Sequence, residues 1–351
     1  MKGFTRFLLL GVLVGAFGLT SNSFAAGKTK TMLYVTNSGG DSVTVINLDT
    51  MKTVGNIVLG KQIHGACAPA DGRTIFFTVM STRTLKIVDT ATNKVLGTIP
   101  LISHPFGGRP NECASTPDGH YVAVPMRFYG KAQPTHGSMD IVDMHQKKVV
   151  KVLPILFPHN CFRAESNDFL YCETRAKGEI YRLNLKTMSF DETFPSGADP
   201  RPFVIDTKTK KIYVALGGFH GFAVVNMENK EVQRVALPPG PPEPAACQKY
   251  EKNTPTHGMD ITPDGKELWV TSLVDGGVYA YNLATKKFSQ EIHTGACPNW
   301  VSITPNGKYV TVSNSIPDTT SVIDTKTQKV VANFKVGKTP RRLLAINVPV
   351  S

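Results

Sequence analysis

One short apolar strand pattern recurs along the chain, and this repeat limits the possible folds more than any other feature. The second residue of each copy is aromatic or leucine, and neighbouring copies lie 40 to 56 residues apart. The positions are Tyr34, Phe76, Tyr121, Leu170, Tyr213, Trp269 and Tyr309. A recurring spacing of this length is the signature of a repeat architecture.

Each copy belongs to a longer unit. A second alternating strand such as 42–47 follows it, then a turn of the form Asp-Thr-x-Thr-x-Lys, then a third strand such as 95–99. A tight turn precedes the copy, in which proline fixes φ and glycine supplies a positive φ. Clear cases of this turn lie at 116–119, 262–265 and 304–307. Four strands per unit and seven units predict an all-β, seven-bladed β-propeller with four-stranded antiparallel blades.

The two ends of the sequence predict how the ring closes. The first copy, at Tyr34, lacks the strand that precedes the other copies, whereas residues 340–346 match that strand. We therefore expect the C-terminal strand to be the innermost strand of the first blade, because this removes the exposed edges of an open array. The length of 351 residues alone would allow two or three domains, but the repeat predicts a single domain over residues 26–351.

The first 25 residues resemble a secretory signal. Lys2 and Arg6 precede an apolar run over 7–19, and Ser23-Phe24-Ala25 places small residues where a signal peptidase cuts. A membrane anchor is the alternative, but the run is too short to span a bilayer comfortably and no later segment approaches membrane length. The sequence therefore predicts an exported protein of the periplasm or an equivalent compartment, with no transmembrane segment in the mature chain.

Aligning the innermost strands brings seven polar residues to one level near the strand start. They are His64, Asn111, Asn160, Arg201, His257, Asn299 and Arg341. Because this strand lines the central channel of a propeller, we expect a ring at one channel mouth that binds a ligand or a partner. An anion, a cofactor or a metal would suit it, although a hydrated channel also favours polar residues. His64 and His257 come from blades two and six, so they should face each other and not chelate one metal together.

Histidines and lysines divide between the two faces of the predicted ring. Two histidines, His120 and His145, lie in turns on the opposite face, whereas the other seven lie near connections on the face of the ring residues. Those seven are His64, His104, His136, His159, His220, His257 and His293. Since histidine is the commonest metal ligand, this favours binding at their face, although loops also tolerate it.

The repeated turns of the opposite face hold many of the lysines behind the net charge of +12. They are solvated turns or a docking surface for an acidic partner, and an exported protein is not expected to bind nucleic acid.

Two insertions interrupt the repeat. The longer one, over 238–256, is rich in proline. It contains polar side chains long enough to contact a partner, at Lys249, Tyr250, Glu251 and Lys252. The shorter one covers 126–137 in blade three. Long ordered loops in compact folds are usually functional, although neutral drift also lengthens loops. Both insertions should project from the histidine-rich face.

The six cysteines are candidates for disulfides, because exported proteins fold in oxidising compartments. Cys161 and Cys172 flank a hairpin turn symmetrically, Cys247 in the longer insertion is a candidate partner of Cys297, and Cys67 and Cys113 lie in neighbouring innermost strands. Buried free thiols are the alternative.

The chain has no Cys-x-x-Cys-His motif for c-type haem, so no covalently bound cofactor is expected. Familiar catalytic signatures such as Gly-x-Ser-x-Gly and His-Glu-x-x-His are also missing, so no catalytic residue is assigned.

The motifs Tyr34-Val-Thr-Asn37 and Val322-Ile-Asp-Thr-Lys-Thr327 resemble the YVTN-repeat β-propeller family over essentially the whole mature chain. Within this family the sequence is similar to the propeller subunits, termed β, of hydrazine synthases. The similarity rests on the YVTN units, the lack of a haem motif and the Pro-rich insertion before His257.

This resemblance implies a non-catalytic, exported subunit without a cofactor, set beside multi-haem catalytic subunits. Such complexes form hydrazine from nitric oxide and ammonium in anaerobic ammonium oxidation, which would place the chain in the anammoxosome lumen. The insertion would then reach toward the substrate channel of the partner, with Glu251 contacting a hydrated divalent cation at the interface.

Two other classes of function remain open. One is a stand-alone periplasmic protein that binds an anionic ligand or a tetrapyrrole over the ring residues. The other is a cell-surface interaction module. Because propellers host many unrelated activities, the fold alone does not separate these classes.

Overall fold

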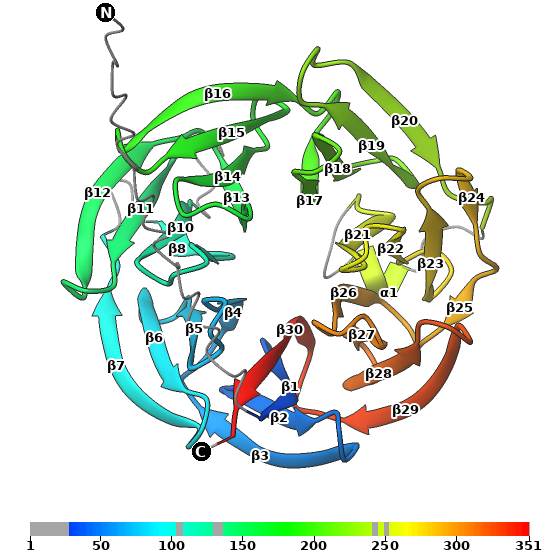
Figure 1. The fold of residues 1–351 in the computed structure, drawn as a ribbon, viewed down its shortest axis with the longest axis horizontal. Coiled ribbons are helices and arrows are strands. Elements are labelled where there is room, and N and C mark those ends of the chain that lie inside the picture. Colours follow the sequence, from blue (N-terminus) through cyan, green and yellow to red (C-terminus); the bar gives the residue numbers. More distant parts are fainter. Residues whose placement is uncertain (1–27, 103–107, 129–135, 241–244, 249–252, 351) are drawn as a thin grey trace, which may run out of the picture.

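The computed structural model describes residues 28–102, 108–128, 136–240, 245–248 and 253–350. Its strands form seven antiparallel sheets arranged as a ring (Figure 1). Each sheet runs from an innermost to an outermost strand, with the innermost strand of blade three split into β8 and β9 and the outermost strand of blade six split into β24 and β25. The prediction of a seven-bladed β-propeller is confirmed.

The blades are numbered in chain order, and the strands of each blade run from the innermost outward. Blade one contains β30 (Pro340–Pro349), β1 (Thr29–Asn37), β2 (Ser42–Asn47) and β3 (Lys52–Val58). Blade two contains β4 (Ile63–Cys67), β5 (Thr74–Val79), β6 (Thr84–Asp89) and β7 (Lys94–Pro100). Blade three contains β8 (Arg109–Pro110), β9 (Ala114–Ser115), β10 (Tyr121–Arg127), β11 (Gly137–Asp143) and β12 (Lys148–Pro154). Blade four contains β13 (Pro158–Arg163), β14 (Phe169–Thr174), β15 (Glu179–Asn184) and β16 (Ser189–Pro195).

The remaining three blades follow the same order. Blade five contains β17 (Pro200–Asp206), β18 (Lys211–Leu216), β19 (Gly221–Asn226) and β20 (Val232–Ala236). A short helix, α1 (Ala245–Gln248), precedes blade six, which contains β21 (Thr256–Ile261), β22 (Glu267–Ser272), β23 (Gly277–Asn282), β24 (Lys287–Phe288) and β25 (Ile292–His293). Blade seven contains β26 (Pro298–Ile303), β27 (Tyr309–Asn314), β28 (Thr319–Asp324) and β29 (Lys329–Lys335).

The C-terminal strand closes the ring as expected from the sequence. β30 pairs antiparallel with β1, from Thr29 opposite Pro349 to Asn37 opposite Pro340. Figure 1 shows this red strand beside the blue strands of blade one. The first blade is therefore assembled from both ends of the chain.

The repeated turns have the geometry that their sequence requires. In the turn before β10, the Gly119 amide donates to the Thr116 carbonyl at 3.0 Å, and Gly119 has a φ of 74°. The positive φ of Gly119 suits glycine, which has no Cβ to clash. In the turn after β28, the Thr327 amide donates to the Asp324 carboxylate at 2.8 Å.

The hydrophobic core lies between neighbouring blades. The inner strands are buried on both faces, as in β5 and β27, whereas the outermost β29 alternates between exposed and half-buried residues. Tyr34 of blade one, for example, packs against Phe77 of blade two with ring centroids 6.3 Å apart. Every blade is thus held by apolar contacts to both of its neighbours.

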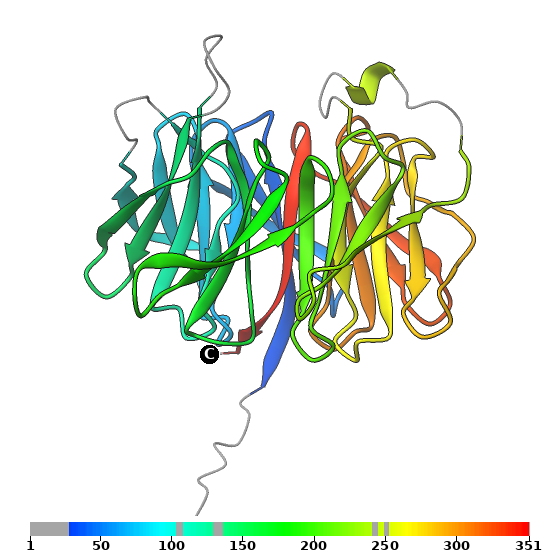
Figure 2. The same ribbon diagram turned by 90° about the horizontal axis from the view of Figure 1, so that it is seen from above.

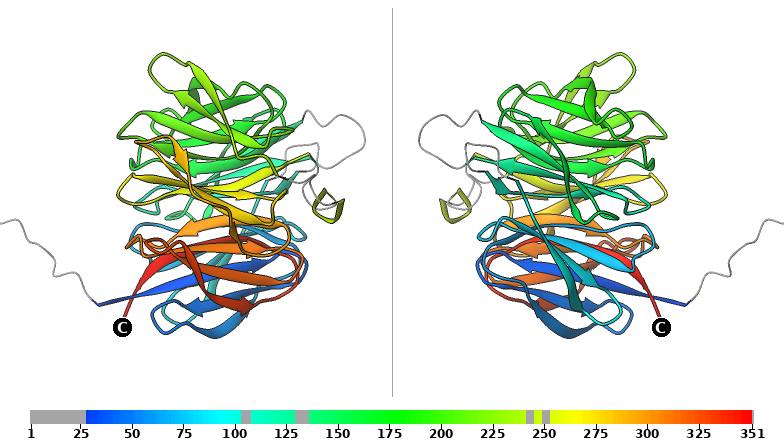
Figure 3. Two further views of the ribbon diagram at one scale, coloured as in Figure 1. Left: turned by 90° about the vertical axis from the view of Figure 1, so that its right-hand side faces the viewer. Right: turned by 90° about the vertical axis from the view of Figure 1, so that its left-hand side faces the viewer.

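The ring has two distinct faces. On the loop face the innermost strands begin, and α1 projects from it (Figure 2). The Thr-Pro-Asp-Gly turns lie on the opposite face, the turn face. Figure 3 shows the blue start of β1 and the C-terminal end of the red β30 on this side of the ring. Within the part of the chain that the structure describes, no helix is long and apolar enough to cross a membrane. The predicted signal at 1–25 lies outside the described residues.

Candidate functional site

The residues of the predicted ring all lie at the starts of innermost strands on the loop face. Six of them, His64, Asn111, Asn160, Arg201, His257 and Asn299, are buried, and Arg341 is half-buried. Their side chains therefore form a polar layer with little access to bulk solvent.

Strand register places His159, and not Asn160, at the level of the other ring residues. In six blades one residue of the innermost strand pairs with the last residue of the second strand, as Pro200 does with Leu216 and Pro298 with Asn314. In blade four this residue is Pro158, paired with Thr174, and His159 follows it directly. Asn160 lies one position further, at the level of Trp300 and Arg342.

Arg342, Asn160 and Trp300 each lie one residue further along their strands than the ring residues. The side chain of Arg342 contacts both of the other two. Its Nε donates to Glu112 Oε2 at 2.7 Å, and its Nη1 donates to Asn299 Oδ1 at 2.9 Å. Nη2 lies 3.5 Å from Asn160 Oδ1, and the guanidinium stacks 4.0 Å from the centroid of the Trp300 ring. Arg342 thus connects blade one to blades three, four and seven.

Glu112 is held by backbone amides as well as by Arg342. Its Oε1 accepts hydrogen bonds from the amides of Ala66 at 2.9 Å and Cys113 at 3.2 Å. Burial raises the pKa of Glu112, although Arg342 and the two amides oppose the rise. An ion pair this deeply buried is costly to desolvate, so its partners must satisfy each other closely.

A second buried pair lies next to this cluster. His159 Nδ1 lies 2.8 Å from Glu173 Oε1, and Asn160 Nδ2 donates to the same oxygen at 2.9 Å. Glu173 Oε2 has no hydrogen-bond partner among the described residues. Burial raises the pKa of Glu173 well above its ordinary value, and burial together with nearby arginines lowers that of His159. Both side chains are therefore driven toward their neutral forms.

Arginines gather around this pair at the loop face. Arg175 forms a two-pronged contact with Asp199, with distances of 2.7 and 2.6 Å, and Arg201 lies 3.3 Å from the same carboxylate. The guanidinium groups of Arg127 and Arg175 lie 4.4 and 4.9 Å from the Phe157 ring. This arrangement groups three guanidinium groups near the loop face.

The ring does not assemble a metal centre among the described residues. His257 Nδ1 lies 2.7 Å from the carbonyl oxygen of Asn299, in the neighbouring blade. The one group of three or more potential ligands within the described ranges is His120, Asp143 and His145, on the turn face. This group was not assigned from the sequence, because its members become neighbours only through strand register.

Disulfides fix the loop-face insertion and two strand pairs. Cys247 in α1 is joined to Cys297 at the start of blade seven, and both pack against Leu273. Cys161 is joined to Cys172 across β13 and β14, and Cys67 to Cys113 between blades two and three. His104 and the partner-facing candidates Lys249, Tyr250, Glu251 and Lys252 lie outside the described residues.

A cavity of about 460 Å³ opens at the turn-face end of the central channel. Arg163, Glu165, Thr207 and Asp260 are among its lining residues. Burial raises the pKa of Asp260 to about 6, although the amides of Ile303 and Ile261 donate to its carboxylate. No sequence pattern predicted this cavity, since its walls come from blades two to six.

Comparisons with known proteins identify the fold. No protein-family model matches the chain, and no curated protein matches it. A Kuenenia stuttgartiensis hydrazine synthase structure has a TM-score of 0.68 and 16% identity, covering 83% of this chain and 92% of that one. A functionally unknown protein from Desulfotomaculum acetoxidans DSM 771 has a TM-score of 0.68 and 14% identity, covering 92% and 100%. Dihydro-heme d1 dehydrogenase NirN in complex with DHE has a TM-score of 0.62 and 14% identity, covering 89% and 74%. At these identities the similarity establishes the propeller fold.

Proposed function

We propose that this chain is a non-catalytic propeller subunit of an exported multi-haem redox complex of the hydrazine synthase type. The observation that carries the proposal is the insertion before β21, which the Cys247–Cys297 disulfide fastens to the loop face (Figure 2). A projection that is covalently fixed in this way loses less conformational entropy when a partner binds. Its role is to dock the catalytic subunits and to shape their substrate channel.

The centre of the ring supports action through the surface of the loop face over a path through the propeller itself. Arg342 and Glu112 fill the axis beneath the loop face, and both side chains are almost fully buried. Opening a path through this level would separate a buried ion pair, which is strongly unfavourable. The contribution of the loop face therefore comes from its surface.

The cysteines support a chain that carries no covalent haem. All six form disulfides, so no thiol is left for thioether attachment. In the proposed complex the haem groups belong to the partner subunits. Glu251 remains the residue proposed to contact a hydrated divalent cation at the interface, because hard cations prefer carboxylate oxygens.

The proposal is tested by shortening the insertion. Deletion of 243–252 together with Cys297→Ala removes α1 without removing any blade strand, and it keeps Asn253, whose carbonyl accepts from the Gly218 amide at 3.0 Å. The variant should fold, as judged by circular dichroism, and should fail to copurify with multi-haem subunits from the native source or a reconstituted complex.

Two controls make this experiment decisive. The Cys247→Ala/Cys297→Ala variant keeps the insertion and releases its anchor, so it should weaken assembly less than the deletion. Lys186→Ala changes an exposed residue of the turn face and should leave assembly intact. Undiminished assembly and hydrazine-forming turnover in the deleted complex, or a wild-type monomer that carries a coloured ligand and no haem partner, would overturn the proposal.

A further inference from the structure

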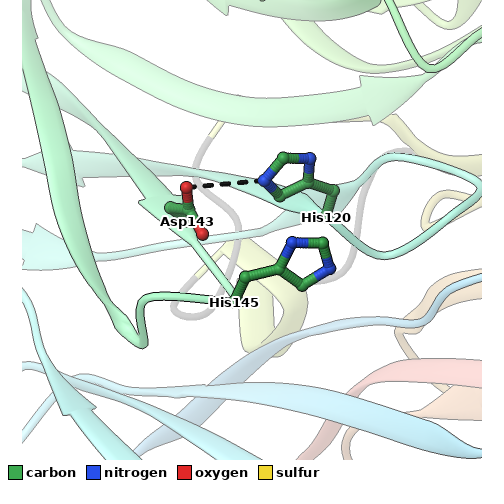
Figure 4. Close-up of side chains that lie close together, drawn as sticks. All are labelled: His120, Asp143 and His145. Atoms are coloured by element: carbon green, nitrogen blue, oxygen red, sulfur yellow. Dashed lines mark ion pairs between the residues drawn. The ribbon is translucent and has the colours of Figure 1, made fainter.

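Two histidines and a carboxylate meet on the turn face of blade three (Figure 4). His120 Nε2 lies 3.4 Å from Asp143 Oδ2, and the rings of His120 and His145 stack with centroids 4.1 Å apart. One ligand atom from each of the three residues lies within 4.8 Å of the other two. Asp143 is nearly buried, whereas His145 is exposed and His120 partly so.

The backbone of blade three fixes the spacing of these residues. His120 immediately precedes β10, and Asp143 ends β11, where it pairs with Tyr121. The amide of Met144 donates to the carbonyl oxygen of His120 at 2.9 Å, which joins the two turns. The ring of Tyr121 also stacks on His120 with centroids 4.0 Å apart. The three side chains are therefore attached to a hydrogen-bonded strand pair and not to a long loop.

Two other blades hold an ion pair at this position. The same backbone bond between the two turns recurs in blade four, from Leu185 to Asp168, and in blade five, from Met227 to Lys210. There the residues equivalent to His120 and His145 form ion pairs, Asp168 with Lys186 and Lys210 with Glu228. Among the described residues, blade three alone places two imidazoles at these positions.

Blade seven provides the closest internal comparison. Its turn keeps the carboxylate as Asp324 and places Lys308 and Lys326 at the two histidine positions. Lysine side chains at these positions repel a cation, whereas neutral imidazoles can donate lone pairs to one. The substitution of histidine for lysine therefore converts a surface turn into a set of possible ligands on the same backbone.

The donor set selects a class of metal. Imidazole nitrogen with one carboxylate suits Zn²⁺, Cu²⁺ or Ni²⁺, and not the all-oxygen shells of Ca²⁺ and Mg²⁺. Metal–nitrogen bonds of about 2.0–2.1 Å require ligand atoms somewhat closer than they now lie. Small rotations of the two partly exposed histidines supply this movement. Gln146 already donates to both oxygens of Asp143, from its amide at 2.9 Å and its side chain at 2.8 Å, and so holds the carboxylate in place.

We propose that His120, Asp143 and His145 bind one divalent transition-metal ion of the Zn²⁺ and Cu²⁺ class, with further coordination positions open to water or to a donor from another molecule. Lys147 and Lys148 in the same turn weaken the attraction for cations, so binding depends on the imidazoles and not on net charge. The site lies on the turn face, away from α1, and does not depend on the proposed docking role.

The test uses the full mature chain without an affinity tag. Calorimetric titration with Zn²⁺ should show one equivalent bound at the site, and Co²⁺ should give a visible absorption band that Zn²⁺ abolishes. The His120→Lys/His145→Lys variant recreates the lysine pair of blade seven, so it should fold and should lose Zn²⁺ affinity at least tenfold.

Two further variants keep the outcome interpretable. His145→Ala places at this exposed position the residue type that blades two and six carry there, Ala91 and Ala284, and should also lose affinity if the double variant does not fold. His293→Gln changes an exposed histidine of the loop face and should leave Zn²⁺ binding unchanged. Absence of Zn²⁺ binding to the wild type, or equal affinity in the His145→Ala variant, would overturn the proposal.

Discussion

Arg342 and Glu112 are 230 positions apart in the sequence, yet Arg342 Nε lies 2.7 Å from Glu112 Oε2 at the axis of the ring. Both side chains are almost completely buried. The pair joins the C-terminal strand to blade three across the centre, in addition to the contacts between neighbouring blades. It therefore couples parts of the ring that share no strand ladder.

Replacing Glu112 with Gln should destabilise the protein by about 3–5 kcal/mol, because the guanidinium of Arg342 would be left buried without its counter-charge. The Arg342→Met/Glu112→Gln double variant should lose less than the sum of the two single variants. Denaturant unfolding measures all three. The exposed Lys186–Asp168 pair is the control, since its removal should cost less than about 1 kcal/mol. Strict additivity at Arg342 and Glu112 would show that the pair is not coupled.

Asp140 should make stability depend on pH. Burial raises its pKa from 3.8 to about 7, although the Ile102 amide donates to it. Between these two values the folded chain holds a proton that the unfolded chain releases, so stability falls as the pH rises. Asp140→Asn removes this effect and should stabilise the protein by about 4 kcal/mol at pH 8, with little change near pH 4.

Unfolding curves of wild type and Asp140→Asn at both pH values test this prediction. A stability difference between wild type and Asp140→Asn that stays constant from pH 4 to pH 8 would contradict the raised pKa.

Disulfide loss should scale with the length of chain that each bond closes. The Cys67–Cys113 bond spans 46 residues and Cys161–Cys172 spans 11. Chain-entropy estimates put their contributions at about 4 and about 3 kcal/mol, respectively. The paired alanine variants, compared by thermal unfolding, should therefore rank with Cys67→Ala/Cys113→Ala as the less stable. The reverse order would indicate that strain or packing outweighs the entropy of the unfolded chain.

Removing residues 340–351 should prevent formation of a stable folded monomer. The truncation deletes β30, the innermost strand of blade one, and exposes the whole edge of β1. Exposed edges pair with other chains, so size-exclusion chromatography should show aggregates or exchanged oligomers. Deletion of residues 350–351 alone leaves β30 complete and is the control. A cooperative monomer after the longer deletion would refute the importance of closure.

The architecture was predictable because each blade repeats its own local pattern. Alternation in strands such as 42–47, proline and glycine in the turns, and the unmatched strand at 340–346 define the blades and their closure without long-range information. The candidate disulfide partners also followed from this alignment, and the structure joins each pair.

The centre of the ring was less predictable for a physical reason. Irregular register near the start of the innermost strands, between Pro158 and Cys161 for example, shifts which side chains share a level. Counting along the sequence therefore selected Asn160 in place of His159. Arg341 does lie at the level of the ring, but the buried Arg342 that follows it was not singled out. His120 and His145 were placed on the same face from the sequence, but their contact with each other was not predicted, because it depends on the register with which β10 pairs with β11.

The pairing of β30 with β1 also orders events during synthesis of the chain. Blades two to seven are each continuous in sequence, so each can form soon after its own residues have been synthesised. Blade one cannot, because β1 must wait with an open edge until residues 340–349 arrive. Completion of the ring is consequently the last step in the assembly of the seven blades, and a chain that stops short of these residues remains an open arc exposed to chaperones and proteases.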